Sequence, residues 1–373
     1  MIKKLNSLTI LFIVTVVMVV LMFITIKRPA DTSEDYSLLF PDLYEQLSTI
    51  DTITFNSSQD QFTLSKPSEG EDWFVNERWN HLADFNLVKR VLIDLADAKI
   101  LERKTAESEQ FSQLGVEGAE EGGSSIHITL LSEDKEISGL ILGLEREAGR
   151  GQGTRRFYVR RAGEQRAWLA EGYLNINPLM LNWIKSEVIN IARERIAQVN
   201  IIQPNGDTAT IVNIGKKDKF GTPEMMAKTV FTYEQLGYDI ASTLYQLRME
   251  DVQPLSDFSR QGSEVVNAEF ISFDGLKVVT ETSFIDGFYY TTFRAEYDKS
   301  AIKTPSADIV ALNVLQTPAQ VQQEVAKLNK ELDSWVYRFG GFTGTNLMRA
   351  KADMVTESGN AIPMPADMMG VVP

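Results

Sequence analysis

The feature that most constrains this chain is an uncharged run of 22 residues close to its N-terminus, Leu5–Ile26. Two lysines precede the run, and Lys27-Arg28 follows it. At about 1.5 Å per residue, a helix of this length spans a hydrocarbon core of about 30 Å. The pattern therefore predicts a membrane anchor over residues 1–28, which contacts the lipid bilayer through residues 5–26.

A cleaved signal peptide is the alternative interpretation of the same run. The apolar region of a signal peptide usually has about 7–15 residues and ends in small residues. This run is longer, and Lys27-Arg28-Pro29 is an unfavourable context for cleavage. We therefore favour an uncleaved anchor. The charges of Lys3, Lys4 and the terminal amine favour a cytoplasmic N-terminus, which predicts a single-pass protein of the bacterial inner membrane with its body in the periplasm.

Composition excludes several functional classes. The chain has 373 residues, no cysteine, two histidines and a net charge of −14. Without the four basic residues of the anchor, 33 basic residues face 51 acidic ones, which gives −18. Such a body is a poor nucleic-acid binder and is repelled by anionic lipid headgroups. The absence of cysteine excludes disulfides, thiolate zinc sites, iron–sulfur clusters and a cysteine nucleophile, and we expect no cofactor.

The first half of the body shows an α+β pattern after a linker and short helix over residues 29–48. A helix is predicted by the stripe Val88, Val91, Leu92 and Leu95, at i, i+3, i+4 and i+7. Short alternating or apolar runs predict strands of antiparallel sheets. These runs are Ile50–Phe55, Phe62–Ser65, Trp73–Val75, Ile126–Leu130, Ile137–Leu142 and Arg156–Arg161.

The second half repeats this order. Two strands joined at Asn205-Gly206 precede a helix with Ile240, Ala241, Leu244 and Leu247, and three further strands follow at Val266–Phe270, Lys277–Thr282 and Phe288–Arg294. The separation from Ile53 to Ile202 is 149 residues, as is that from Leu95 to Leu244. A constant separation favours two tandem, duplicated α+β units, although two ordinary α+β stretches could agree by coincidence.

Predicted boundaries follow from these patterns. Helix-rich segments at Leu179–Ile191 and Pro318–Tyr337 end the two halves. We therefore expect α+β repeats over residues 49–195 and 196–350. Residues 351–373 are rich in methionine and proline, have no period, and are expected to form a disordered tail.

Several short motifs occur in a characteristic order over residues 38–355. They are Phe40-Pro41-Asp42-Leu43, Trp73, Asp84, Leu95-Ala96-Asp97-Ala98-Lys99, Leu142-Gly143, Phe157-Tyr158-Val159-Arg160 and Ser334-Trp335-Val336-Tyr337-Arg338-Phe339. Each is weak alone, but their order resembles a bacterial envelope family known as domain of unknown function 4340. The chain departs from that family in its Gly115–Gly123 insertion and its methionine-rich tail.

What the resemblance implies is a partner rather than a reaction. Members of the family look like single-anchor proteins whose genes often lie beside gliding-type ABC transport components. The resemblance therefore implies an accessory envelope protein that contacts an ABC transporter or other envelope proteins. It supplies no catalytic residues.

Candidate chemical sites are few. His81 and His127 are too far apart for a local metal motif, and a structural role is favoured for both. The segment Gly149–Arg156 is a candidate anion-binding loop through Arg150, Arg155 and Arg156, but it lacks the lysine and Ser/Thr of a Walker A loop and also fits a plain hairpin tip. Nearby carboxylates are expected to be solvated charges rather than a hydrolytic pair; they are Glu117, Glu120, Glu121, Glu145 and Glu147.

Aromatic residues offer a candidate ligand platform. Trp73 and Trp79 could stack on sugar rings, although core packing is the more common role of such tryptophans. Sheet packing is likewise favoured for Tyr289, Tyr290 and Phe293.

These observations predict a non-enzymatic, membrane-anchored extracytoplasmic accessory or scaffold protein. A periplasmic solute or glycan sensor is the alternative, and a membrane-anchored hydrolase is less favoured.

Overall fold

The computed structural model describes residues 37–118, 123–146, 154–223 and 229–357, which form two compact units. The predicted anchor lies outside these residues. Among the residues described, no helix is both long and apolar enough to cross a bilayer. The first unit ends at Trp183, and the second begins at Ile184 but also includes Asn76–Asp84, which we call the inserted segment. This division lies at 183/184, whereas the boundary expected between the repeats is 195/196.

The first unit contains eight strands and three α-helices among its described residues. The strands are β1 (Thr52–Ser57), β2 (Gln61–Ser65), β3 (Phe74–Val75), β5 (Lys99–Arg103), β6 (Ile126–Ser132), β7 (Lys135–Arg146), β8 (Arg155–Arg161) and β9 (Ala167–Gly172). The helices are α2 (Leu43–Gln46), α3 (Phe85–Asp97) and α4 (Phe111–Leu114), with 3₁₀ turns at Leu47–Thr49, Ser108–Gln110 and Met180–Trp183.

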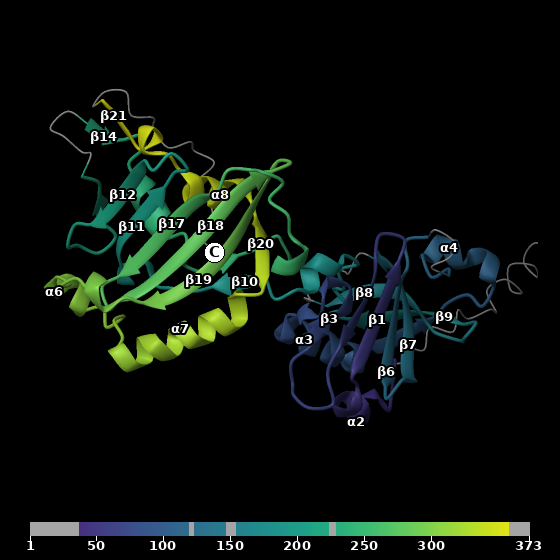
Figure 1. Ribbon diagram of the computed structural model, residues 1–373. Coiled ribbons are helices and arrows are strands. Elements are labelled where there is room, and N and C mark those ends of the chain that lie inside the picture. Colours follow the sequence, from purple (N-terminus) through teal and green to yellow (C-terminus); the bar gives the residue numbers. More distant parts are fainter. Residues whose placement is uncertain (1–36, 119–122, 147–153, 224–228, 358–373) are drawn as a thin grey trace, which may run out of the picture. The chain divides into compact units, whose positions relative to one another are not determined.

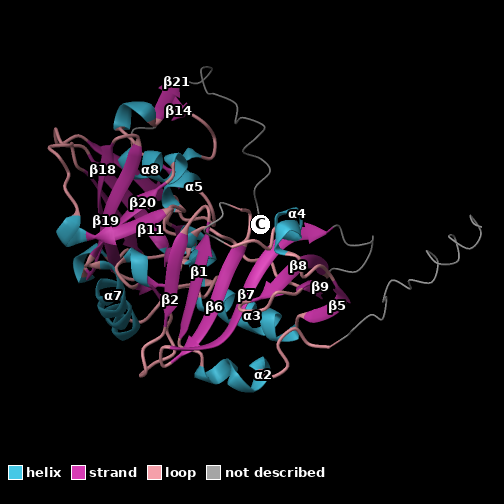
Figure 2. Cartoon of the chain, turned by 90° about the vertical axis from the view of Figure 1, so that its right-hand side faces the viewer, coloured by secondary structure: helices cyan, strands magenta, loops and turns pink. Residues whose placement is uncertain are grey.

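These strands form an antiparallel sheet in the order β3-β2-β1-β6-β7-β8-β9-β5. Figure 2 labels the strands from β2 to β5 of this order. Alternation along β1 buries Ile53 and Phe55. Phe55 pairs with Phe62 on β2, and the two rings stack at 4.6 Å between centroids. The fully buried Trp183 closes this layer at 4.5 Å from the Phe55 ring. The predicted stripe of α3 is buried as expected.

The second unit contains thirteen strands and four α-helices among its described residues. The strands are β4 (His81–Leu82), β10 (Glu187–Ile189), β11 (Ile196–Ile202), β12 (Thr208–Asn213), β13 (Phe220–Gly221), β14 (Thr229–Phe231), β15 (Leu247–Arg248), β16 (Asp251–Pro254), β17 (Val266–Ser272), β18 (Leu276–Ile285), β19 (Phe288–Tyr297), β20 (Trp335–Phe339) and β21 (Val355–Glu357). The helices are α5 (Leu236–Ala241), α6 (Ala307–Val310), α7 (Pro318–Leu332) and α8 (Gly341–Met348). Single 3₁₀ turns lie at Asn76–Arg78, Arg193–Arg195, Leu255–Asp257, Lys299–Ala301 and Lys351–Asp353.

The main sheet of the second unit has the order β13-β12-β11-β17-β18-β19-β20-β16, and its paired strands are all antiparallel. The first sheet has the same arrangement, position by position. In each sheet a hairpin lies on one side, the edge strand that follows the helix lies on the other, and the remaining strands lie between them. The predicted α+β fold with antiparallel sheets is therefore confirmed. The constant separation of 149 residues does not mark equivalent positions, because Ile53 is fully buried whereas Ile202 is half-buried.

The predicted second helix and the predicted Leu179–Ile191 helix both differ from the structure. Helix α5 ends at Ala241, where Thr243 donates its hydroxyl to the Asp239 carbonyl. In the other segment, a 3₁₀ turn leads into β10, which pairs with β15. Both segments contain residues that favour bends or strands over a continued helix.

The end of the chain also departs from expectation. The predicted helix Pro318–Tyr337 stops at Leu332, and the aromatic run after it forms β20. Of the expected disordered tail, residues 351–357 form a 3₁₀ turn and β21, which pairs with β14. Residues 358–373 lie outside the described residues.

Helix α7 lies along β19 (Figure 1). Its first turn carries a capping box in which Thr317 and Gln320 bond each other's backbone N–H. The Asn329 amide accepts from the Ala295 N–H at 2.7 Å and donates to the Ala295 carbonyl at 2.9 Å. Asn329 thus completes the hydrogen bonding of β19 where β20 does not reach.

A buried ion cluster holds α7 against the rest of the second unit. Arg195, with a side chain only 4% exposed, bonds Asp274 through Nε at 2.9 Å and Glu324 through Nη2 at 2.8 Å. The Ser272 hydroxyl and the Gln316 N–H also donate to the Asp274 carboxylate. Burial alone would raise the pKa of Asp274. These hydrogen bonds and Arg195 outweigh burial and hold the pKa of Asp274 below its usual value.

The cluster yields a stability prediction. Asp274→Asn leaves the buried guanidinium of Arg195 undercompensated and should lower the free energy of unfolding of the second unit by about 3 kcal/mol. Urea unfolding with pulsed hydrogen exchange, read on α7 peptides, measures this unit separately. Glu281→Gln, which removes an exposed partner of Arg260, is the matched control and should change it by less than about 1 kcal/mol. Equal effects of the two variants would contradict a structural role for the cluster.

Candidate functional site

The inserted segment brings an exposed tryptophan to the second unit. Ala83 forms an antiparallel bridge with Ile184, and the Leu82 carbonyl accepts from the Lys185 N–H at 2.8 Å. Trp79 and Asn80 both have left-handed backbone, with φ of 52° and 53°. This conformation costs about 1–2 kcal/mol per non-glycine residue. The strained turn holds Trp79 with 45% of its surface exposed.

His81 fixes this turn from its other side. Its ring meets Trp335 edge-on at 4.8 Å between centroids, and its Nδ1 lies 3.3 Å from the Leu82 carbonyl oxygen. Burial, opposed by the backbone contact and aided by the charge of Lys185, lowers the pKa of His81 to about 4. His81 is therefore a neutral packing residue at pH 7 and does not serve as a proton donor there.

Three side chains of the main sheet form a row beside Trp79. Asp251 on β16 pairs in register with Arg338 on β20, which pairs in turn with Tyr290 on β19. Directly opposed residues of antiparallel strands project from the same face. Gln253 and Val336 form the next pair of the same face. The row is therefore fixed by strand register rather than by loop conformation.

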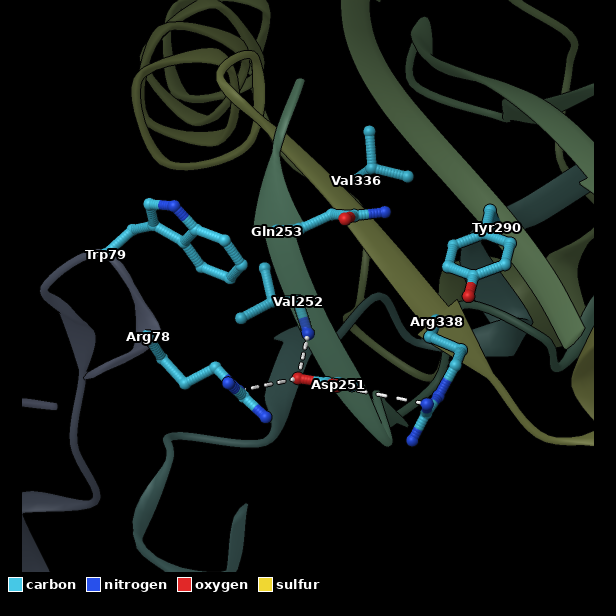
Figure 3. A pocket seen from close by; sticks show the side chains of 8 residues that line it. All are labelled: Arg78, Trp79, Asp251, Val252, Gln253, Tyr290, Val336 and Arg338. Carbon is cyan, nitrogen blue, oxygen red and sulfur yellow. Dashed lines mark hydrogen bonds and ion pairs between the residues drawn. The ribbon is translucent and has the colours of Figure 1, made fainter. Parts of the chain in front are cut away.

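The carboxylate of Asp251 lies between two guanidinium groups (Figure 3). Arg78 Nε is 3.2 Å from Oδ1, and Arg338 Nη1 is 3.9 Å from Oδ2. Oδ1 also accepts the Val252 N–H at 2.9 Å. The buried Nε atoms of Arg78 and Arg338 both lack a well-aligned hydrogen bond. Arg338 Nε also lies 3.9 Å from Glu250 Oε2, so each guanidinium group has at least one carboxylate nearby.

The outer edge of β16 is blocked against strand addition. The Leu255 N–H donates to the Ser334 carbonyl within the ladder, so alternation turns the nitrogens of Val252 and Pro254 outward. The Val252 N–H is taken by Asp251, and proline has no N–H to offer. Such edges resist pairing with another chain. Binding at this site therefore depends on side chains.

Together these residues line a cavity of about 120 Å³. A water molecule occupies ~30 Å³, so the cavity holds a few waters or one side chain. Its lining consists of Arg78, Trp79, Asp251, Val252, Gln253, Tyr290, Val336 and Arg338 (Figure 3). The one carboxylate in this lining is already paired with cations. The cavity is suited to holding an acceptor group beside an aromatic ring, and it has no paired acid and base.

The predicted anion-binding arginines lie elsewhere. Arg150 falls outside the described residues. Arg155 and Arg156 open β8, where each is paired with a carboxylate: Glu145 at 3.1 Å and Glu171 at 3.4 Å. Their charges are thus partly neutralised within the first unit.

The predicted aromatic platform is divided between the units. Trp73 is only 5% exposed, with Lys66 Nζ 5.9 Å from its ring centroid, whereas Trp79 lines the cavity. Phe293 packs edge-on against Tyr337 and Phe339 in the core. Tyr290 is the member of its group that reaches the cavity.

The remaining candidates have local partners. His127 Nε2 lies 3.1 Å from the Glu117 carbonyl oxygen. Glu117 was expected on an exposed loop, but it is 7% exposed because its carboxylate folds back to accept the Ser124 N–H. Glu120, Glu121 and Glu147 lie outside the described residues.

Sequence reasoning missed Arg78, Asp251 and Arg338 as site residues. Arg78 precedes Trp79, and Arg338 belongs to the closing motif, but both appeared as isolated charges. The Arg78–Asp251 contact spans 173 positions of the chain and the Asp251–Arg338 contact spans 87, so only the strand register and the inserted segment reveal them.

One known protein family matches this chain. The family described as Domain of unknown function (DUF4340) matches residues 73–263, about half of the sequence. The chain belongs to this family. The match contains Arg78, Trp79 and Asp251, whereas Tyr290 and Arg338 lie beyond it. No curated protein and no solved structure matches the chain significantly.

The buried histidine gives a pH prediction. Because the pKa of His81 is about 4 in the fold and 6.5 ordinarily, the unfolded chain binds more protons between these values. The free energy of unfolding should therefore fall by about 3 kcal/mol as the pH drops from 7 towards 4. His81→Phe keeps a ring against Trp335 and should remove this part of the dependence, whereas Trp79→Ala should retain it. Urea unfolding at pH 7.0 and 4.5 measures the difference, and an unchanged slope in His81→Phe would refute this role.

Proposed function

We propose that this protein is a non-enzymatic, membrane-anchored extracytoplasmic accessory protein that binds another envelope protein through the cavity around Trp79. In this proposal residues 5–26 anchor it in the inner membrane with a cytoplasmic N-terminus, and two duplicated α+β units lie in the periplasm. The flanking charges of the apolar run and the common strand order of the two sheets support these parts.

The observation that carries the proposal is the composition of the cavity. Tryptophan, tyrosine and arginine dominate the energetics of protein interfaces. One Trp, one Tyr and two Arg converge here on a space the size of one side chain. Trp79 is held exposed at the expense of backbone strain, which is typical of residues kept for recognition.

The chemistry of the lining defines the occupant. The lining itself holds two guanidinium groups and one carboxylate, so it carries a positive excess in a protein of net charge −14. Glu250, which is outside the lining, offsets part of this excess at 3.9 Å from Arg338 Nε. An Asp or Glu side chain of a partner fits this excess, because both guanidinium groups have Nε–H groups without a well-aligned hydrogen bond, although each lies near a carboxylate of this chain. Since the edge of β16 is blocked, we propose an acidic segment that inserts one carboxylate beside Trp79 rather than adding a strand.

The class of partner follows from charge and family. The acidic body repels anionic lipid, which favours a protein partner over the membrane surface. The family resemblance favours a component of an ABC-type transport system. The alternative of a solute or glycan sensor stays a proposal and is taken up below for a different cavity. A membrane-anchored hydrolase stays the less favoured alternative: of its candidate carboxylates, Glu145 is paired with Arg155 and Glu117 is buried, and the others lie outside the described residues.

Site-specific crosslinking tests the docking site. The photoreactive residue p-benzoylphenylalanine replaces Trp79 in the full-length protein in native membranes, and Tyr173, 58% exposed in the first unit, is the control position. We expect a discrete adduct with one envelope protein from position 79 and none from position 173. Mass spectrometry of the adduct should place the crosslink in an acidic segment.

Charge reversal sharpens the test. Arg338→Glu should reduce the yield of this adduct at least tenfold, because it replaces a docking cation with an anion. Arg294→Glu alters a 71% exposed arginine on β19 and should leave the yield unchanged. An absent adduct, or equal yields in the two variants, would rule out docking at this cavity. An adduct with a protein unrelated to transport would retain docking and exclude the transporter role.

A further inference from the structure

A second cavity lies in the second unit, between the turn after α5 and helix α8. Its volume is about 310 Å³, which is within the size range of small-ligand pockets. From the turn come Ser242, Thr243, Tyr245, Gln246 and Arg248, and from α8 come Phe342, Thr343 and Asn346. It shares no lining residue with the cavity around Trp79.

Two polar groups of this cavity lack hydrogen-bond partners. Asn346 is 1% exposed, yet its amide oxygen makes no hydrogen bond. The buried hydroxyl oxygen of Ser242 is unpaired as well. Buried polar groups in folded proteins are almost always hydrogen-bonded, because leaving one unpaired is destabilising. Both groups border the cavity, so a ligand within it can satisfy them.

Aromatic side chains frame the same space. Phe342 is 53% exposed and Tyr245 is 37% exposed. The Arg193 guanidinium lies 4.4 Å from the centroid of the Tyr245 ring, which fixes the orientation of that ring. Gln246, at the bend, has left-handed backbone with φ of 47°, and its N–H donates to the Asn190 side chain. The rings are thus presented by a strained and tethered turn.

The unpaired groups select the chemistry of the ligand. An amide carbonyl accepts only, so a carboxylate or phosphate cannot satisfy it. A hydroxyl both donates and accepts, so it can satisfy Asn346 in either orientation of its amide and Ser242 as well. The other polar members of the lining are hydroxyl and amide groups together with one carboxylate, Asp239, and one guanidinium, Arg248, all of which can bond sugar hydroxyls. A ligand with several hydroxyls and an apolar ring face, which is a sugar ring, matches both the polar and the aromatic parts.

From this geometry we propose that the second unit binds a saccharide between Asn346, Ser242 and the rings of Tyr245 and Phe342. This binding site goes beyond the docking function, because it recognises a neutral sugar and uses a separate cavity. The sugar is either a free solute or a unit of an envelope glycan, and these sources differ in whether a single ring suffices.

Calorimetric titration of the full-length protein tests the proposal. The protein is held in a detergent without a sugar headgroup, since alkyl glycosides would compete. The probes are glucose, galactose and N-acetylglucosamine, together with the disaccharides cellobiose, lactose and chitobiose. We expect at least one of the six to bind with a millimolar or lower Kd. Binding of a monosaccharide indicates a free solute, and binding of disaccharides alone indicates a glycan chain.

Variants locate the site. Phe342→Ala changes an exposed side chain and should weaken binding at least tenfold, and Asn346→Leu should abolish it. Phe284→Ala, which removes a 50% exposed phenylalanine outside the lining, and Trp79→Ala should both leave the Kd unchanged. If none of the six probes binds at 20 mM, water alone fills the cavity and the proposal fails. It also fails if binding occurs but Phe342→Ala has the same Kd as Phe284→Ala.

Discussion

The second unit depends on one buried cation, Arg195. Removing a guanidinium from water costs several kcal/mol, and the structure offsets this with two carboxylates that each bond it twice. Asp274 belongs to the turn between β17 and β18, and Glu324 belongs to α7. Burial of Arg195 therefore fixes that helix relative to the sheet. With α7 in place, Asn329 takes over the hydrogen bonding of Ala295, and β20 pairs with β19 only over Tyr289–Thr291. The register of that short ladder sets Tyr290 beside Arg338.

The same logic explains how strain at Trp79 is maintained. Two consecutive left-handed residues relax unless their surroundings determine the backbone. Here the residues after the turn are fixed by the His81–Trp335 contact and by the bond from Lys185 to Leu82. The residue before it, Arg78, is paired with Asp251. Neutral His81 belongs to this support, which links the exposure of Trp79 to the packing of an imidazole that disfavours protonation.

Much of the fold could be predicted from periodicity, and most of the site could not. The α3 stripe and the alternation along β1 report burial directly, so their elements were found. Helix ends were predicted poorly, because α5 stops where hydroxyl side chains compete for the backbone and α7 gives way to the β-forming run of β20. A common order of elements along the two halves was anticipated, but not the order of strands within the sheets, and the assumed separation of 149 residues aligns the buried Ile53 with a half-buried residue. Asp251 gives no local signal, since its role arises only when register places Arg338 beside it.

Strands at equivalent positions of the two sheets carry rows of charged side chains that differ in their pairing. In the first, Glu171 on β9 pairs in register with Lys99 on β5 and Arg156 on β8, so a carboxylate stands between two cations. Glu171 also accepts from Thr154 and Arg156, and its row is neutralised from within. In the second, the central position holds Arg338, whose neighbours in the row are one carboxylate and a phenol. Its Nε–H has no well-aligned hydrogen bond and lies 3.9 Å from Glu250 Oε2, at the place where the inserted segment adds Arg78 and Trp79. One row is therefore neutralised within its own sheet, whereas the other lines the cavity at which we propose that a partner docks.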